Sequence, residues 1–113
     1  MGDDTADRIR AMLPVPWREK AMFGGLSFMV DDKMLLNVRR GGDLLVRVDP
    51  ERSEKLVAEH GVAVAEMGAG RSMGPSWLTV PAEQFAGDEQ LRVWLDEALA
   101  FNRQAVAHPR RRR

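Results

Sequence analysis

Residues 26–48 read LSFMVDDKMLLNVRRGGDLLVRV, and this stretch decides the fold. Apolar residues recur at every second position in three short segments, which is the pattern of half-buried β-strands. Asp31-Asp32 and the stretch from Arg40 to Asp43 separate the segments with residues that favour tight turns. The pattern therefore predicts a meander of three antiparallel strands.

The alternation also assigns side chains to the two faces of this meander. One set is uniformly apolar and is expected to face helices: Leu26, Phe28, Val30, Met34, Leu36, Val38, Leu44, Val46 and Val48. The other set mixes apolar and polar residues and is expected on an open face: Ser27, Met29, Leu35, Asn37, Arg39, Leu45 and Arg47. Such a face could receive a protein partner or simply be solvated. A partner surface predicts exposed apolar side chains at Met29, Leu35 and Leu45.

Helices are expected before and after the meander. Residues 4–13 carry an apolar stripe and stop at Pro14. Asp49 and Pro50 are a typical helix start, and Gly61 is placed to end that helix. Residues 88–105 repeat apolar side chains at i, i+3 and i+4, which predicts a longer helix with one buried stripe.

Two more short strands are expected over residues 62–66 and 77–80, giving the order α-βββ-α-ββ-α. This order predicts an α+β fold, a two-layer sandwich in which helices cover one five-stranded, mainly antiparallel sheet. The 113 residues fit one domain, expected over 1–107, and a disordered basic tail, expected over 108–113.

Composition excludes several classes of protein and site. The chain has no cysteine, so it holds no disulfide, no thiolate metal site and no thiol nucleophile. No apolar run approaches the roughly 20 residues that span a bilayer, and the acidic first residues do not resemble a signal peptide. We therefore expect a cytoplasmic protein without a membrane contact, either a monomer or a homodimer.

Charge is distributed unevenly along the chain. The last four residues carry four of its 17 basic side chains, so residues 1–109 hold 13 basic and 17 acidic groups. An acidic body disfavours nucleic-acid binding, although a basic tail could contact phosphates or acidic proteins, or only keep the chain in solution. The candidate nucleic-acid arm consists of Arg110, Arg111, Arg112 and Arg113.

Catalytic and cofactor motifs find little support. Residues 70–74 read GRSMG and match the nucleophile elbow of serine hydrolases. That elbow requires a strand-to-helix turn, whereas Pro75 and a strand follow here. The two histidines, His60 and His108, lie far apart and suggest no metal site. We expect no cofactor, no metal and no enzymatic activity, with a hydrolase using Ser72 as a remote alternative.

Two arginines and the methionines remain as candidates for binding. Arg47 lies inside a predicted strand, where it could extend into water, pair with a carboxylate or stack on an aromatic ring. Arg71 lies in a glycine-rich connection near Met73. The seven methionines could form an adaptable surface, or they could fill the core.

Several motifs together resemble the TfoX/Sxy N-terminal domain family. They occur in the family's order over residues 18–102: KAMFGGLSFMV from Lys20, Lys33-Met34, LVRVD from Leu45, GRSM from Gly70, and Trp94. The resemblance implies a two-layer fold like that of secretion chaperones and no established catalytic residues. Residues that match the family pattern are Met22, Phe23, Gly24, Gly25, Arg47, Arg71 and Met73.

The resemblance also bears on function. Characterised members are bacterial regulators of natural competence that act with a cyclic-AMP receptor protein at promoters and carry a second, helical domain. This chain is expected to be a stand-alone member without that domain. We expect a non-enzymatic regulatory or adaptor domain that binds a protein partner through the open sheet face or an edge. The alternative is a regulator that contacts nucleic acid through its arginine tail.

Overall fold

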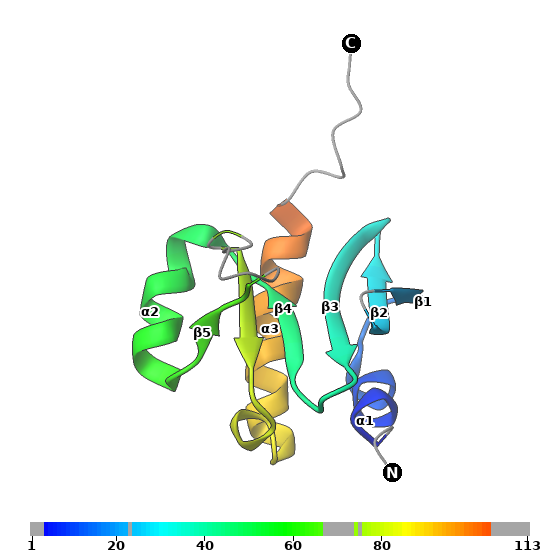
Figure 1. Ribbon diagram of the computed structural model, residues 1–113. Helices are drawn as coiled ribbons and strands as arrows, with labels where there is room; N and C mark the ends of the chain where they lie inside the picture. Colours follow the sequence, from blue (N-terminus) through cyan, green and yellow to red (C-terminus); the bar gives the residue numbers. More distant parts are fainter. Residues whose placement is uncertain (1–3, 23, 67–73, 75, 105–113) are drawn as a thin grey trace.

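The computed structural model describes residues 4–22, 24–66, 74 and 76–104. These residues form three α-helices, one short 3-10 helix and six strands (Figure 1). The helices are α1 (Asp4–Met12), α2 (Pro50–His60), α3 (Asp88–Gln104) and the 3-10 helix η1 (Ala82–Gln84). The strands are β1 (Arg18–Met22), β2 (Gly25–Val30), β3 (Lys33–Arg39), β4 (Leu44–Arg47), β5 (Ala63–Val64) and β6 (Trp77–Val80).

All six strands belong to one sheet, in the order β1-β2-β3-β4-β6-β5, and each neighbouring pair is antiparallel. The predicted meander and the α+β class are confirmed. The predicted count of five strands is one too low, because β1 was not foreseen. Its sequence, REKAM, lacks apolar alternation because four of its five residues are exposed. Charged residues of this kind are common on edge strands.

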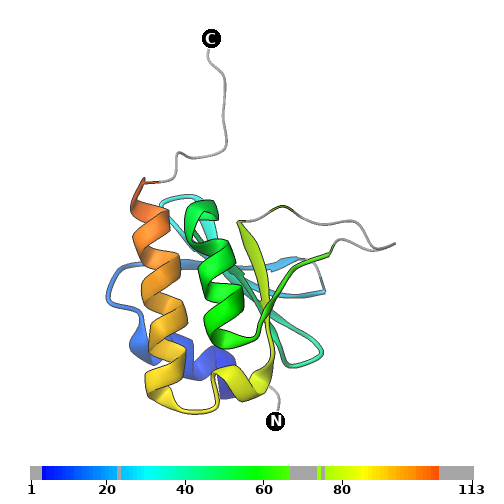
Figure 2. The same ribbon diagram turned by 90° about the vertical axis from the view of Figure 1, so that its left-hand side faces the viewer.

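Helices α2 and α3 cover one face of the sheet (Figure 2). The predicted boundaries of α2 are confirmed by its caps. The Asp49 side chain accepts a hydrogen bond from the Glu51 amide at 2.9 Å, and Gly61 has φ 68°. The buried stripe of α3 packs into the main core together with the helix-facing residues of β2, β3, β4 and β6. The stripe consists of Leu91, Trp94, Leu95, Ala98, Leu99 and Asn102.

A β-bulge in β3 overturns part of the predicted assignment of faces. The register places Phe28 opposite Leu36 but Met29 opposite Met34, so Leu35 is an extra residue. A bulge shifts the alternation by one position, so that side chains on either side of it change faces. Leu35 is only 1% exposed and belongs to the main core. Leu35 was therefore wrongly placed on the open face.

Met34 makes the opposite change. Its sulfur lies 3.1 Å from Ser27 Oγ, on the face that Ser27 and Asn37 share. Met34 is half-buried there and does not face the helices as expected. Leu45 keeps its predicted face, but it is only 2% exposed, so the prediction of an exposed leucine there was also wrong.

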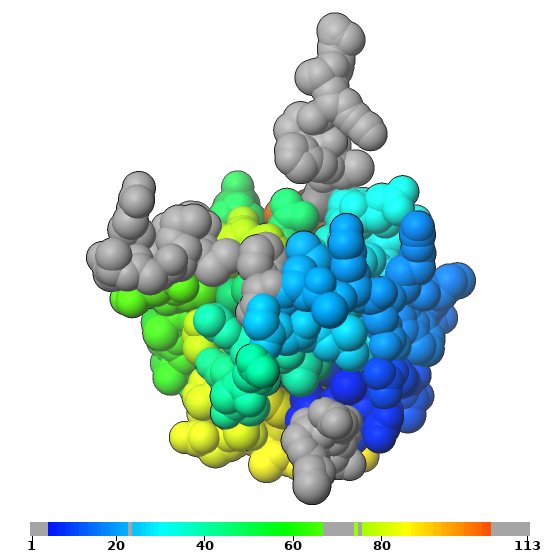
Figure 3. Space-filling model, turned by 45° about the vertical axis from the view of Figure 1, so that its right-hand side comes forward, coloured from blue at the N-terminus to red at the C-terminus, as the bar shows by residue number. Residues whose placement is uncertain are grey.

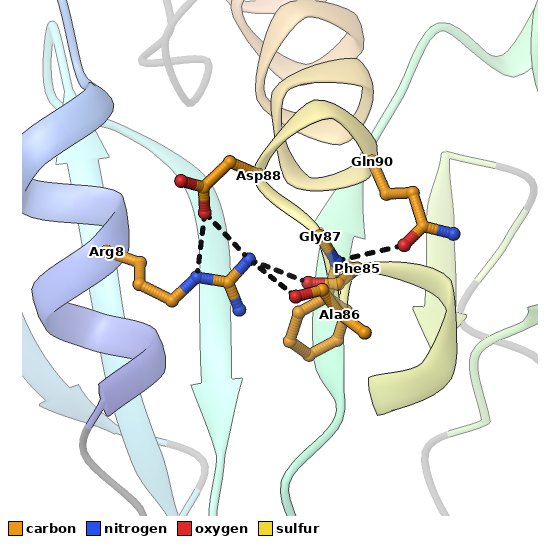
Figure 4. A network of polar contacts seen from close by, with 6 residues as sticks. All are labelled: Arg8, Phe85, Ala86, Gly87, Asp88 and Gln90. Atoms are coloured by element: carbon orange, nitrogen blue, oxygen red, sulfur yellow. Dashed lines mark hydrogen bonds and ion pairs between the residues drawn. The ribbon is translucent and has the colours of Figure 1, made fainter.

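A polar network joins α1 to the start of α3 (Figure 4). The Arg8 guanidinium donates to the carboxylate of Asp88 and, through Nη2, to the carbonyl oxygens of Phe85 at 3.0 Å and Ala86 at 3.2 Å. The Gln90 side chain accepts from the Gly87 amide at 3.0 Å. Helix α1 is therefore fixed to the connection that leads from the sheet into α3.

Candidate functional site

Met22, Gly24 and Gly25 lie where β1 is followed by β2, and the register pairs Met22 with Gly25. Gly24 has φ +71°, a conformation that glycine adopts without steric cost. A Cβ on Gly25 would lie 2.2 Å from the carbonyl oxygen of Val38 in β3, so no larger residue fits. Asn37 donates to the carbonyl oxygen of Met22 at 3.1 Å and to Ser27 Oγ at 2.7 Å. The family-like residues described here thus shape a hairpin.

Arg47 lies where the end of β4, the start of β6 and the last turns of α3 meet. The carbon of its guanidinium is 5.5 Å from the centroid of the Trp77 ring and 5.2 Å from that of Phe101. Stacking on aromatic rings is one of the alternatives that the sequence left open. Burial lowers the pKa of Arg47, and its Nε is buried without a hydrogen-bond partner among the described residues. Two ring contacts offset this desolvation, and Arg47 packs against both rings at this junction.

Several sequence-predicted candidates lie outside the described residues. They are Phe23, Arg71, Ser72, Met73 and the four arginines at 110–113. Within the described ranges, no group of three or more aspartate, glutamate or histidine side chains is placed to hold a metal ion. No helix in those ranges is both long and apolar enough to cross a membrane.

The free edge of β1 is the candidate site that the sequence did not reveal. β1 pairs with β2 on one side and is the last strand of the sheet, at the right-hand margin of Figure 1. Figure 3 shows the blue part of the chain, which includes β1, along the outside of the molecule. Edge strands offer unpaired N–H and C=O groups to another strand.

The register shows which backbone groups of β1 are free. The Arg39 amide donates to the Asp43 carbonyl oxygen at 3.0 Å. At the C-terminal end of β3, the backbone groups of the odd-numbered residues Asn37 and Arg39 are therefore directed towards β4. Along an antiparallel strand, successive residues direct their backbone hydrogen bonds to opposite neighbouring strands. Leu26 and Phe28 of β2 therefore bond to β3, and Ser27 between them bonds to Lys20 in β1. The N–H and C=O groups of Glu19 and Ala21 consequently point away from the sheet.

The side chain of Glu19 anchors β1 to α1. Arg10 Nε and Nη2 donate to its two carboxylate oxygens at 2.8 and 2.9 Å, and Trp17 Nε1 donates at 2.9 Å. The hydrogen bonds from Arg10, followed by that from Trp17, lower the pKa of Glu19 to about 2. Because the folded-state pKa lies below the ordinary value, this anchor persists at neutral pH and is lost only as the pH falls from about 4.5 towards 2.

Two hollows adjoin the start of β1. One, of about 560 Å³, lies between the segment 14–18, the β2–β3 turn and the end of α3, with Trp17, Met29 and Leu99 among its walls. The second, of about 430 Å³, continues along Arg18, Glu19 and Lys20. Both are lined by Arg18, Met29 and Asp32, so the two hollows adjoin beside the edge, and together they are called the groove. We call β1 together with this groove the β1 edge site.

Comparison with known proteins gives one result. The TfoX N-terminal domain family matches residues 13–102, which is most of the chain and includes every strand of the sheet. No curated protein and no solved structure is significantly similar to the chain. The matched range confirms the resemblance that the motifs indicated, and the chain belongs to the TfoX N-terminal domain family.

Proposed function

We propose that this chain is a non-enzymatic regulatory or adaptor domain of the bacterial cytoplasm that binds an extended segment of a partner protein at the β1 edge site. Membership in the TfoX N-terminal domain family supports a regulatory role. The free backbone groups of Glu19 and Ala21 carry the proposal, because they are arranged to bond to one more strand.

The edge is a better candidate than the open sheet face. Leu35 and Leu45, which were expected to make that face apolar, are almost completely buried. Met29 is half-buried and lies beside the edge, in the groove. Of these three expected apolar residues, Met29 is therefore the one that a partner could reach, and it lies beside β1.

The charges of β1 disfavour pairing with a second copy of itself. In a symmetric antiparallel pair centred on Glu19, Arg18 of each copy would face Lys20 of the other. A pair centred on Lys20 would oppose two lysines. Like charges directly opposite each other are destabilising. A pair centred on Ala21 avoids these contacts between like charges, but β1 ends at Met22, so few of its residues could pair. A different chain is the better partner.

Ala21→Pro tests the proposal with little disturbance to the fold. Proline removes an N–H that points away from the sheet, and Ala21 is exposed. With a partner captured by cross-linking from bacterial extract and then purified, we expect Ala21→Pro to weaken binding at least about tenfold, since a strand hydrogen bond is lost and the ring obstructs the edge. Isothermal titration calorimetry measures the affinity.

Ala21→Val is the matched control, because it keeps the N–H and suits a strand. We expect its affinity to stay within about threefold of the unmodified protein, less than 1 kcal/mol. Circular dichroism verifies that both variants are folded. Equal binding by Ala21→Pro and Ala21→Val would rule out the addition of a strand at this edge.

A further inference from the structure

We infer that the segment bound at the β1 edge site carries acidic residues at alternate positions, with apolar residues between them. This inference rests on the proposed function and specifies the chemistry of the partner. It follows from the charges on the two faces of β1 and from the groove beside the strand.

One face of β1 is basic. Arg18 lies opposite Met29 and Lys20 lies opposite Ser27, so both basic side chains share the open face of the sheet. Arg18 Nη1 is 3.7 Å from Asp32 Oδ1, and both side chains are more than three-quarters exposed, so this ion pair contributes little. Lys20 has no ion-pair or hydrogen-bond partner within the described part of the chain.

The charged side chain on the other face of β1 already has an ion-pair partner. Glu19 lies opposite Phe28, on the helix side of the sheet, where Arg10 neutralises it. Ala21 is uncharged. An incoming strand therefore meets two positive charges on one face, and within the described residues only Arg18 has an ion pair there, a weak and exposed one with Asp32. On the other face, the charge of Glu19 is already held by Arg10, which also pairs with Asp7.

The geometry of paired strands determines which residues of the bound segment lie opposite these charges. Side chains alternate between faces, so the partner residues opposite Arg18 and Lys20 are two positions apart. Opposite charges at these positions stabilise the pairing and fix its register. The groove at the Arg18 end has apolar walls at Trp17, Met29 and Leu99, which suit a large apolar side chain of the same segment.

The test uses two fluorescein-labelled peptides of eight residues, one alternating glutamate with valine and the other alternating lysine with valine. Fluorescence anisotropy at low salt is expected to show that the protein binds the glutamate peptide at least about tenfold more tightly, a difference of about 1.4 kcal/mol. The double variant Arg18→Glu with Lys20→Glu is expected to reverse the preference. Raising the salt concentration should weaken the preference, because exposed charges are screened.

The control variant places the same charge changes elsewhere. Lys55 on α2 and Arg92 on α3 are exposed and lie on helices that cover the opposite side of the sheet. Lys55→Glu with Arg92→Glu should therefore keep the preference for the glutamate peptide. If this control reverses the preference as well, the effect comes from net charge and the inference is wrong.

Two further outcomes separate this inference from the proposed function. Equal affinity for both peptides, together with a loss of partner binding in Ala21→Pro, would overturn the acidic pattern and leave strand addition intact. Binding of the glutamate peptide that Ala21→Pro does not weaken would contradict both, because the peptide would then bind by charge alone.

Discussion

Replacing Leu35 with asparagine is expected to unfold much of the protein. Leu35 occupies the bulge in β3 and is 1% exposed, within the main core. Loss of a buried leucine costs about 2–5 kcal/mol, and a buried amide without partners adds about 1–3 kcal/mol. Together these approach the whole stability of a small domain. Urea unfolding followed by tryptophan fluorescence measures the change.

Met34→Asn is the matched variant, one residue away in the same strand. Met34 is half-buried, and its sulfur accepts a hydrogen bond from the Ser27 hydroxyl at 3.1 Å. We expect a loss of about 1 kcal/mol, as for a partly exposed residue. The simple alternation of the sequence places Met34 in the core and Leu35 on the open face, and it therefore predicts a larger loss of stability for Met34→Asn than for Leu35→Asn. A larger loss for Met34→Asn than for Leu35→Asn would show that β3 has no bulge at this position.

Gly25→Ala is expected to cost about 3 kcal/mol, the upper part of the usual range for overpacking, because the contact is with backbone and forces the strands apart. The new Cβ would lie 2.2 Å from the Val38 carbonyl oxygen and 2.7 Å from Asn37 Oδ1. Only a shift of β2 relative to β3 could relieve the first of these contacts. Thermal unfolding followed by circular dichroism measures the loss.

Gly24→Ala provides the comparison within the same turn. A Cβ on Gly24 would contact nothing within 4 Å, so only its positive φ opposes the substitution. That conformation costs a non-glycine residue roughly 1–2 kcal/mol. If the two alanine variants were equally stable, close packing of β2 on β3 would not explain Gly25.

The sequence predicted the parts of the fold that depend on local signals. The turn at Asp31-Asp32 is present, and both aspartates have positive φ, which this residue type tolerates better than most. The caps of α2 at Asp49 and Gly61 are also confirmed. Each of these features is determined by residues close together in the chain, so composition and spacing suffice to predict it.

The remaining differences depend on contacts between distant residues. The bulge at Leu35 arises from the pairing of β3 with β2, and nothing in the alternation of residues 33–39 marks it. Strand β1 is charged because it lies at an edge, so its sequence resembles that of a loop. The strand predicted over residues 62–66 is shortened to Ala63–Val64, which lies at the other edge of the sheet and pairs only with β6.

The candidate site was missed for the same reason. The sequence contains Arg18, Glu19 and Lys20 in order, but only the register shows that the two basic side chains share a face. Only the position of Arg10 in α1 shows that Glu19 is neutralised. Arg47, by contrast, is an unusual residue inside a strand on sequence alone, and the rings of Trp77 and Phe101 account for it.

The most direct test of strand addition at the β1 edge is amide hydrogen exchange followed by nuclear magnetic resonance, with and without the glutamate–valine peptide. In the free protein the amides of Glu19 and Ala21 should exchange quickly, whereas the Lys20 amide, bonded to β2, should be protected. Addition of the peptide should slow exchange at Glu19 and Ala21 and leave Lys20 nearly unchanged. If Glu19 and Ala21 exchange equally fast with the peptide bound, no strand is added at β1 and the proposed mode of binding is wrong.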